Sequence, residues 1–221
     1  MAKEGRLEQC AVEVSVGTVT LEGYLHIPPK ARGIVVFAHG SGSGRNSPRN
    51  LYVARILNNA GLATLLFDLL TAKEEAEDKL TARLRFDIPL LAGRLVGMTD
   101  WLTKNADTMN FKVGYFGAST GAAVAIVAAA ERPKVRAIVS RGGRPDLAKS
   151  ALSLVKAPTL LIVGGEDDVV IGLNQRAYDE IKAEKELVVI PGATHLFEEP
   201  GTLEEVARLA SDWFIKHFRD F

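Results

Sequence analysis

The chain has 221 residues, of which 47% are hydrophobic and 24% charged, and its 27 lysines and arginines balance 27 aspartates and glutamates. This length and balance predict one globular domain over residues 1–221, large enough to bury a sizeable core. A formal net charge of zero gives no electrostatic attraction for nucleic acid or an anionic membrane, so we expect neither partner and a small-molecule ligand instead.

The beginning of the chain and its one cysteine give expectations about location. The first residues, MAKEGRLEQC, are charged and lack the apolar segment of a signal peptide, and the longest apolar stretch, GAAVAIVAAA, is too short to cross a bilayer. We therefore expect a cytoplasmic protein, either monomer or homodimer. Cys10 stands beside the alternating stretch AVEVSV, which predicts a small buried side chain rather than a catalytic thiol.

The first predicted elements form a β-hairpin. Apolar residues alternate over residues 12–16 and again over 19–27, as in strands with one buried face. The Gly-Thr pair between them is a two-residue link typical of antiparallel hairpins.

After residue 33 the pattern changes to short, continuous apolar stretches typical of strands buried on both faces. Helix-like segments alternate with them, which predicts a largely parallel sheet covered by helices on both sides. With the hairpin we count eight strands, in an α/β architecture without a large cap domain. The six later stretches are GIVVFAH, LATLLFD, KVGYFGA, VRAIVSR, TLLIVGG and ELVVIPG.

Two helices carry recognisable end signals. In SPRNLYVARILNNAG, Ser47 is a candidate N-cap, Pro48 takes the first helical position and Gly61 follows the end. Near the C-terminus, Thr202 and Glu205 have the spacing of a capping box. Residues 69–85, LLTAKEEAEDKLTARLR, are charged and weakly periodic, and we expect a solvated surface loop there in preference to a functional lid.

The stretch GYFGASTGA contains the frame G-x-S-x-G, formed by Gly117, Ser119 and Gly121, between a predicted strand and a predicted helix. A nucleophile at such an elbow needs a strained backbone and small neighbours, and the following helix directs its N–H groups toward developing negative charge. The alternative is that Ser119 or Thr120 merely caps the helix over residues 120–131.

A serine nucleophile needs a base and an acid to orient that base. His195 follows the last predicted strand, and Asp167 and Asp168 follow the seventh. All lie at the carboxyl ends of strands, where open α/β sheets place their sites, in the chain order Ser, Asp, His. His26 and His217 fall in the hairpin and the last helix, where we expect peripheral roles.

The motifs GASTG, GGEDDVV and GATHLF together resemble the α/β-hydrolase fold, and most closely its compact dienelactone-hydrolase-like branch. The resemblance implies a triad of Ser119, His195 and Asp167, with Asp168 as the second candidate for the acid, because Val170 stands three residues after Asp167. Dienelactone hydrolases proper have cysteine at the position of Ser119, so their specific lactone is not implied. We expect a serine hydrolase that cleaves small carboxylic esters or lactones, without cofactor or metal.

The stretch VFAHGSGSG also matches this family. The resemblance implies that His39 supports the loop structurally. It also implies that the backbone N–H groups of Ser41 and Thr120 form the oxyanion hole. Arg45, Arg141 and Arg144, in loops at the same sheet edge, are candidates to bind a substrate carboxylate. The alternative is that such arginines anchor loops through Asp68 and Asp146.

Two other functions compete with hydrolysis. Glycines 40, 42 and 44, with Asp68 ending the next strand, imitate a dinucleotide-binding turn, but they give G-x-G-x-G and the helix begins only near Pro48. A hydrolase fold used as a binding module, without efficient catalysis, is the second alternative, because fold does not determine function.

Overall fold

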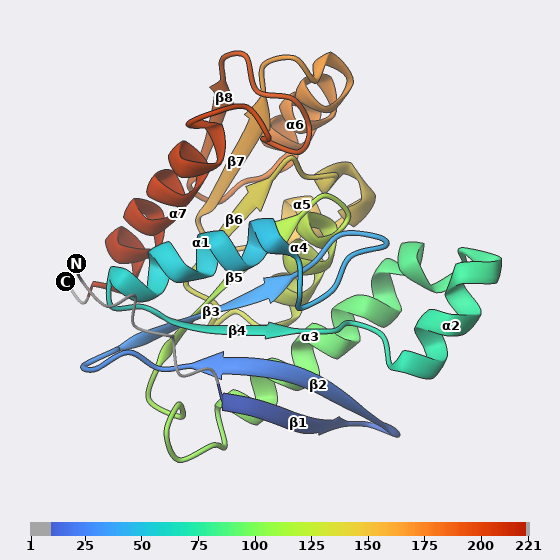
Figure 1. The fold of residues 1–221 in the computed structure, drawn as a ribbon. Helices are drawn as coiled ribbons and strands as arrows, with labels where there is room; N and C mark the ends of the chain where they lie inside the picture. Colours follow the sequence, from blue (N-terminus) through green and yellow to red (C-terminus); the bar gives the residue numbers. More distant parts are fainter. Residues whose placement is uncertain (1–9, 220–221) are drawn as a thin grey trace.

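The computed structural model describes residues 10–219 and is built on an eight-stranded sheet with the order β1-β2-β4-β3-β5-β6-β7-β8 (Figure 1). The predicted mostly parallel sheet with an N-terminal antiparallel hairpin is confirmed. The strands are β1 (Cys10–Val16), β2 (Val19–His26), β3 (Gly33–Ala38), β4 (Ala63–Phe67), β5 (Lys112–Ala118), β6 (Ala137–Arg141), β7 (Thr159–Gly164) and β8 (Lys185–Ile190).

The hairpin and the parallel part of the sheet meet at β2. Val16 pairs with Val19 across the link, where Gly17 adopts φ +60°. β2 then runs antiparallel to β4, with Gly23 opposite Phe67, and every further pairing from β4 to β8 is parallel. The carboxyl ends of β3 to β8 therefore face one edge of the sheet.

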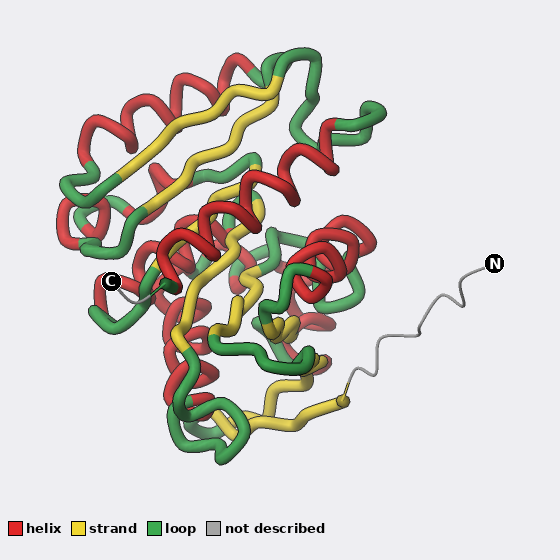
Figure 2. The backbone as a smooth tube through the Cα atoms, turned by 90° about the vertical axis from the view of Figure 1, so that its left-hand side faces the viewer, coloured by secondary structure: helices red, strands yellow, loops and turns green. Residues whose placement is uncertain are grey.

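Helices cover both faces of this sheet (Figure 2). One face packs against α1 and α7, and the other against α3, α4, α5 and α6. The helices are α1 (Pro48–Asn59), α2 (Ala72–Thr81), α3 (Ile88–Leu102), α4 (Gly121–Glu131), α5 (Ala151–Leu154), α6 (Asp168–Glu180) and α7 (Thr202–Phe218).

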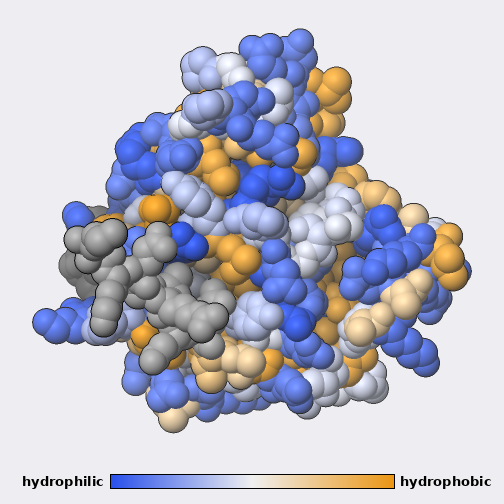
Figure 3. Space-filling model, in the orientation of Figure 1, coloured by the Kyte–Doolittle hydropathy of each residue, from blue (hydrophilic) through white to orange (hydrophobic). Residues whose placement is uncertain are grey.

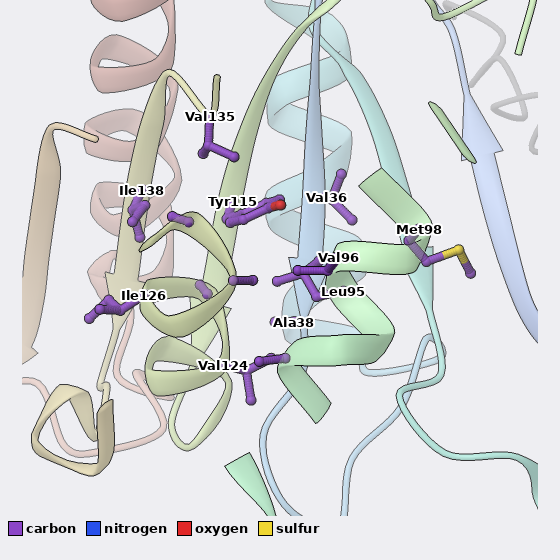
Figure 4. Packing of buried hydrophobic residues seen from close by; sticks show 14 of the residues in the cluster. Val36, Ala38, Leu95, Val96, Met98, Tyr115, Val124, Ile126, Val135 and Ile138 are labelled. Carbon is purple, nitrogen blue, oxygen red and sulfur yellow. The ribbon is translucent and has the colours of Figure 1, made fainter. Parts of the chain in front are cut away.

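The core under α3 and α4 is dense and almost entirely apolar (Figure 4). Leu95 of α3 and Val124 of α4 lie over Val36 and Tyr115 of the central strands, and all four side chains are fully buried. The Tyr115 hydroxyl is hydrogen-bonded to Thr99 Oγ1 at 2.6 Å, so burial does not leave it without a partner. This core fixes β5 and α4, the two elements that flank Ser119.

The predicted ends of α1 are observed, but those of α7 differ. Ser47 Oγ accepts the Asn50 N–H at 3.4 Å, and Gly61 follows the helix in a left-handed conformation. At α7 the predicted capping box is wrong, because Gly201, with φ +84°, is the N-cap. Thr202 lies inside the helix, and its hydroxyl donates backward to the Glu199 carbonyl at 2.8 Å.

The expectation of a buried Cys10 is also wrong. Cys10 is exposed and begins β1, which is an edge strand with a neighbour on one side only. Of the β1 side chains, Val14 alone is fully buried in the core. Alternation identified the strand, but it did not show how little of this edge the helices cover.

Residues 69–85 are not the expected loop. They contain α2, which projects at the right of Figure 1, and a turn of 3-10 helix over Leu84–Phe86. Thr71 and Glu74 form a capping box in which each side chain accepts the other's backbone N–H, at 3.2 and 2.8 Å. Glu74 also binds Arg94 of α3 at 2.7 Å, which ties α2 to the body of the protein.

Asp78 closes the other end of α2. Its carboxylate accepts the N–H groups of Leu84 and Arg85, at 2.7 and 3.1 Å, and the Arg85 side chain at 2.5 Å. Burial alone would raise the pKa of this carboxyl, but the hydrogen bonds from Arg85 and Leu84 outweigh it and hold the pKa below its ordinary value. The turn after α2 thus depends on one side chain.

The face shown in Figure 3 is largely hydrophilic, with apolar groups interspersed. Leu80 of α2 is the most exposed large apolar side chain of the described residues, at 89%, and Phe86 is 55% exposed. Within residues 10–219, no helix is long and apolar enough to cross a membrane.

We predict that Asp78→Ala unfolds the end of α2 locally, because two partly buried N–H groups and a guanidinium lose their acceptor. Hydrogen exchange should rise over residues 72–86 and stay unchanged in β5. Glu77→Ala, at an exposed neighbouring position, is the matched control and should leave the exchange pattern as it is. Equal protection in both variants would contradict the role given to Asp78.

Candidate active site

Ser119 lies at a sharp turn between β5 and α4. Its backbone adopts φ +51°, in the left-handed region that non-glycine residues rarely enter. Its N–H donates to the Arg141 carbonyl at 3.2 Å, and its own carbonyl accepts the N–H groups of Ala122 and Arg144, at 3.1 and 2.9 Å. Neighbouring elements therefore hold the strained conformation in place.

The two glycines of the frame are required by space. A Cβ on Gly117 would lie 2.5–2.7 Å from backbone atoms of Gly121 and Ala122, and one on Gly121 would lie 2.8 Å from the His39 carbonyl oxygen. Neither glycine has a positive φ, so close packing and not backbone freedom explains their presence. The sequence argument for a steric demand at this elbow agrees with these distances.

His195 and Asp167 meet at the same edge of the sheet. His195 Nδ1 lies 2.7 Å from Asp167 Oδ2, which fixes the orientation of the imidazole ring. The side chain of His195 is 39% exposed and that of Asp167 is 16% exposed, so the ring is reachable from solvent while its partner is mostly enclosed.

The same carboxylate begins α6. Asp167 Oδ1 accepts the Val170 N–H as the helix N-cap, which leaves Oδ2 for His195. Val170, which stands three residues after Asp167 in the sequence, is therefore the N3 position of the helix that Asp167 caps. Asp168 is the first helical residue and its side chain is exposed, so the structure places Asp167 rather than Asp168 against His195.

Backbone hydrogen bonds between loops bring these side chains to the strand carrying Ser119. The Glu166 N–H donates to the Ala193 carbonyl at 2.9 Å, which joins the loop after β7 to the loop after β8. Gly142, directly after β6, lies against His195, since a Cβ there would be 3.6 Å from His195 Cε1. His195 thus lies beside Gly142. The residue before Gly142 is Arg141, whose carbonyl oxygen accepts the Ser119 N–H.

The glycine-rich loop after β3 passes directly over Ser119. A Cβ on Gly40 would lie 3.0 Å from Ser119 Cβ and 3.7 Å from Ser119 Oγ. The next residue is Ser41, whose N–H the sequence placed in the oxyanion hole. In the structure this N–H donates to the Thr120 side-chain oxygen at 2.9 Å, a contact that sequence reasoning did not foresee.

His39 supports this loop with both ring nitrogens. Nε2 accepts the Leu69 N–H at 3.0 Å, so Nδ1 carries the proton and donates to the Gly40 carbonyl at 3.0 Å. Burial lowers the pKa of His39, although the hydrogen bond to Gly40 acts in the opposite direction. The ring is neutral and joins β3 to the chain that follows β4.

Asp68, which the dinucleotide-binding alternative would assign to a ribose, is bound by another residue of the chain. Its Oδ1 accepts the Arg45 N–H at 2.7 Å, and its Oδ2 pairs with the Arg45 side chain. A Cβ on Gly44 would lie 2.7 Å from Asp68 Oδ1, so the glycine is where the loop packs on this carboxylate. These contacts give Asp68 a structural role in the loop.

The three candidate arginines differ in their partners. Arg45 binds Asp68 and Glu22 and lies over the Tyr24 ring, and Arg144 forms two hydrogen bonds with Asp146, at 2.9 and 2.8 Å. These two therefore anchor loops, which was the alternative interpretation.

Arg141 is only 7% exposed, and within residues 10–219 its Nε and Nη1 have no hydrogen-bond partner. Its Nη2 lies 3.5 Å from Asn50 Oδ1. Burial and the neighbouring Arg49 lower the pKa of Arg141 to about 10, so it remains charged at neutral pH. It is a buried cation without a carboxylate partner.

A cavity of about 250 Å³ lies beside the loop after β3, and α2 lines one side of it. Leu69, Leu70 and Leu91 give it an apolar wall, and Glu75 and Lys79 line its α2 side. Ser41 and Thr120 border it as well, so it lies next to the turn that holds Ser119. Among the residues described, no three His, Cys, Asp or Glu side chains are arranged to hold a metal ion.

Comparison with known proteins identifies the family of the chain. Residues 21–218 match the dienelactone hydrolase family. The chain belongs to the dienelactone hydrolase family. The solved structure of a dienelactone hydrolase from Anabaena variabilis is 64% identical, covers 96% of this chain and 99% of its own, and superposes with a TM-score of 0.94. The family resemblance seen in the three motifs is therefore confirmed, and the chain is an α/β hydrolase.

Other relatives are more distant or longer. Est1E from Butyrivibrio proteoclasticus shares the fold with a TM-score of 0.77 at 18% identity, covering 94% of this chain and 98% of its own. A Mycobacterium tuberculosis protein named a putative phosphoribosyl transferase is 62% identical over 207 residues, which are 93% of this chain. This chain spans only 46% of that protein's length, so the matching segment is less than half of the relative.

We predict that His39 makes the stability of the fold depend on pH. Its pKa is lowered in the folded protein, so the stabilisation is complete above pH about 6.5 and is lost as the pH falls below that value. In His39→Gln the amide oxygen can still accept the Leu69 N–H but does not titrate. Urea unfolding at pH 7 and pH 5 should show a smaller loss of stability for His39→Gln than for the wild type. Equal losses would contradict this assignment.

Proposed function

We propose that the protein is a serine hydrolase that cleaves small carboxylic esters or lactones through an acyl-enzyme intermediate. The observation that carries the proposal is the 2.7 Å contact between His195 and Asp167, beside a serine held at φ +51°. Structural residues rarely combine a strained nucleophile with an oriented imidazole at the carboxyl edge of a parallel sheet.

In the first half of the reaction, Ser119 Oγ attacks the carbonyl carbon and His195 Nε2 accepts the hydroxyl proton. Asp167 keeps Nδ1 protonated, which leaves Nε2 free to act as the base, and it stabilises the imidazolium that forms. The backbone N–H of Thr120, at the start of α4, and that of Ser41 bind the negative oxygen of the tetrahedral intermediate.

In the second half, the imidazolium gives its proton to the departing alcohol, and Ser119 retains the acyl group. Water then attacks the carbonyl carbon of the acyl-enzyme while His195 removes a proton from that water. When the second intermediate collapses, the C–O bond to Ser119 breaks, His195 returns the proton to Ser119 Oγ, and the carboxylic acid is released. The partial exposure of His195 leaves a route for this water.

The size of the substrate follows from the space available. The cavity of about 250 Å³ next to Ser41 and Thr120 lies just below the range usual for drug-sized ligands. α2 closes its outer side and is fixed by the Glu74–Arg94 and Asp78–Arg85 ion pairs. We therefore propose short acyl or alcohol groups.

The triad is tested with an activated acetate ester and a fluorophosphonate. We predict stoichiometric labelling of Ser119 in the wild type, with labelling lost in Ser119→Ala and His195→Ala. Asp167→Asn keeps an N-cap for α6 but supplies the wrong hydrogen-bond partner to His195, so turnover should fall by roughly three orders of magnitude or more. Asp168→Asn, at the exposed neighbouring position, is the matched control and should retain full turnover.

A folded wild-type protein that neither labels at Ser119 nor hydrolyses the ester would favour the binding-module alternative. Equal activity in Asp167→Asn and the wild type would remove Asp167 from the mechanism. Tight binding of a nicotinamide nucleotide would instead revive the dinucleotide alternative. Phosphoribosyl transfer is not proposed, because the relative with that name has more than half of its length outside the match.

We further propose that Arg141 recognises a carboxylate on the substrate. Its Nε and Nη1 lack a partner among the described residues, and a buried cation without a counter-charge is unfavourable. The Arg141 carbonyl accepts the Ser119 N–H, so Arg141 lies at the end of the strand next to the proposed nucleophile. A substrate carboxylate would supply the missing partner.

Arg141→Met should raise KM about tenfold or more for an ester whose acyl group carries a carboxylate, and leave KM for the matching neutral ester unchanged. It should not destabilise the protein, because it replaces an unpaired buried charge by an apolar side chain. Arg144→Gln, which loses an arginine already paired with Asp146, is the control. An unchanged preference in Arg141→Met would rule out this role.

A further inference from the structure

The side chain of Thr120 has an unusual position for a residue that begins a helix. A threonine at an N-cap ordinarily accepts an N–H of the first helical turn through its hydroxyl, but Thr120 makes no such bond. The turn is completed by backbone atoms, since the Ala122 N–H donates to the Ser119 carbonyl and the Ala123 N–H to the Thr120 carbonyl, both at 3.1 Å. The hydroxyl is free for another partner.

That partner is the Ser41 N–H, which donates to Thr120 Oγ1 at 2.9 Å across 79 residues of sequence. The contact is partly buried, since Thr120 is only 5% exposed while Ser41 is exposed. Gly40, the residue before Ser41, lies against the Ser119 side chain. The Thr120 hydroxyl oxygen therefore accepts the hydrogen bond of the Ser41 N–H, a donor that lies next to the nucleophile.

We infer that Thr120 Oγ1 takes the place of the substrate oxygen in the free enzyme, so that the oxyanion hole is occupied by the protein's own hydroxyl until a carbonyl displaces it. This inference rests on the proposed serine-hydrolase function. Thr120 thus has two roles, because its N–H binds the substrate oxygen and its side chain competes with that oxygen for Ser41.

An alternative role for the same contact is to hold the loop after β3 in place. The loop has other anchors, which do not involve Thr120. His39 accepts the Leu69 N–H at 3.0 Å, Asp68 accepts the Arg45 N–H at 2.7 Å, and the Ser43 N–H donates to the Gly40 carbonyl at 3.2 Å. Because these anchors fix the loop on both sides of Ser41, losing the Thr120 contact frees the N–H without releasing the loop.

The competition has a defined kinetic signature. The hydroxyl must leave the Ser41 N–H before the oxyanion can bind there, so its displacement adds to the barrier between the free enzyme and the transition state. Removing the hydroxyl should therefore raise kcat/KM. If the contact instead held the loop, its loss would weaken binding of the oxyanion and lower kcat/KM.

The test compares Thr120→Ala with Thr120→Ser, which keeps the hydroxyl and is the matched control. For a small activated acetate ester we expect Thr120→Ala to raise kcat/KM about two- to tenfold. Labelling by a small fluorophosphonate should accelerate by a similar factor. Thr120→Ser should show a smaller rise than Thr120→Ala in both assays, because its hydroxyl can still accept the Ser41 N–H.

Hydrogen exchange at the Ser41 amide provides a second measurement that does not depend on turnover. It should be faster in Thr120→Ala than in the wild type, with unchanged protection in α4 showing that the helix still forms. A fall in kcat/KM, or identical kcat/KM and identical exchange in the two proteins, would overturn the inference. If the wild type is not labelled at Ser119, the proposed serine-hydrolase function fails. The amide exchange still tests the contact between Ser41 and Thr120 in that case, because it does not depend on turnover.

Discussion

Ser119 holds a left-handed backbone conformation, and close packing surrounds it. Gly40 lies against its side chain, Gly117 and Gly121 leave no room for side chains of their own, and the Arg141 carbonyl accepts its N–H. The cores above and below the sheet keep β5 and α4 in the positions that this packing demands. The apolar interior thus stabilises a local geometry that the isolated segment would not adopt.

The supporting groups around the elbow are shared between structural and chemical tasks. Asp167 caps α6 with one oxygen and orients His195 with the other. His39 uses one nitrogen to hold the chain after β4 and the other to hold Gly40. Because each group has two partners, its side chain has little freedom, and preorganisation of this kind is what an oxyanion-stabilising site requires.

Features that depend on interactions between residues close in sequence could be predicted more readily than features that depend on contacts between distant residues. Buried strands and the ends of α1 were predictable because apolar periodicity and Pro48 act locally. α2 was missed because its interior is charged, although its capping box at Thr71 and Glu74 could have been recognised. Local signals also misled, since Gly201 rather than Thr202 caps α7. Which amide faces Thr120 depends on a contact across 79 residues that no local pattern records.

The strain at Ser119 also bears on how such a protein changes over generations. Glycine at this position would relieve backbone strain of about 1–3 kcal/mol and remove the hydroxyl of the proposed nucleophile in the same step. Under the proposed mechanism, a substitution that stabilises the fold here also abolishes hydrolysis, so selection for abundance alone favours the inactive form. A lineage released from the need for hydrolysis has a short mutational path to a stable, non-catalytic carrier of the same cavity.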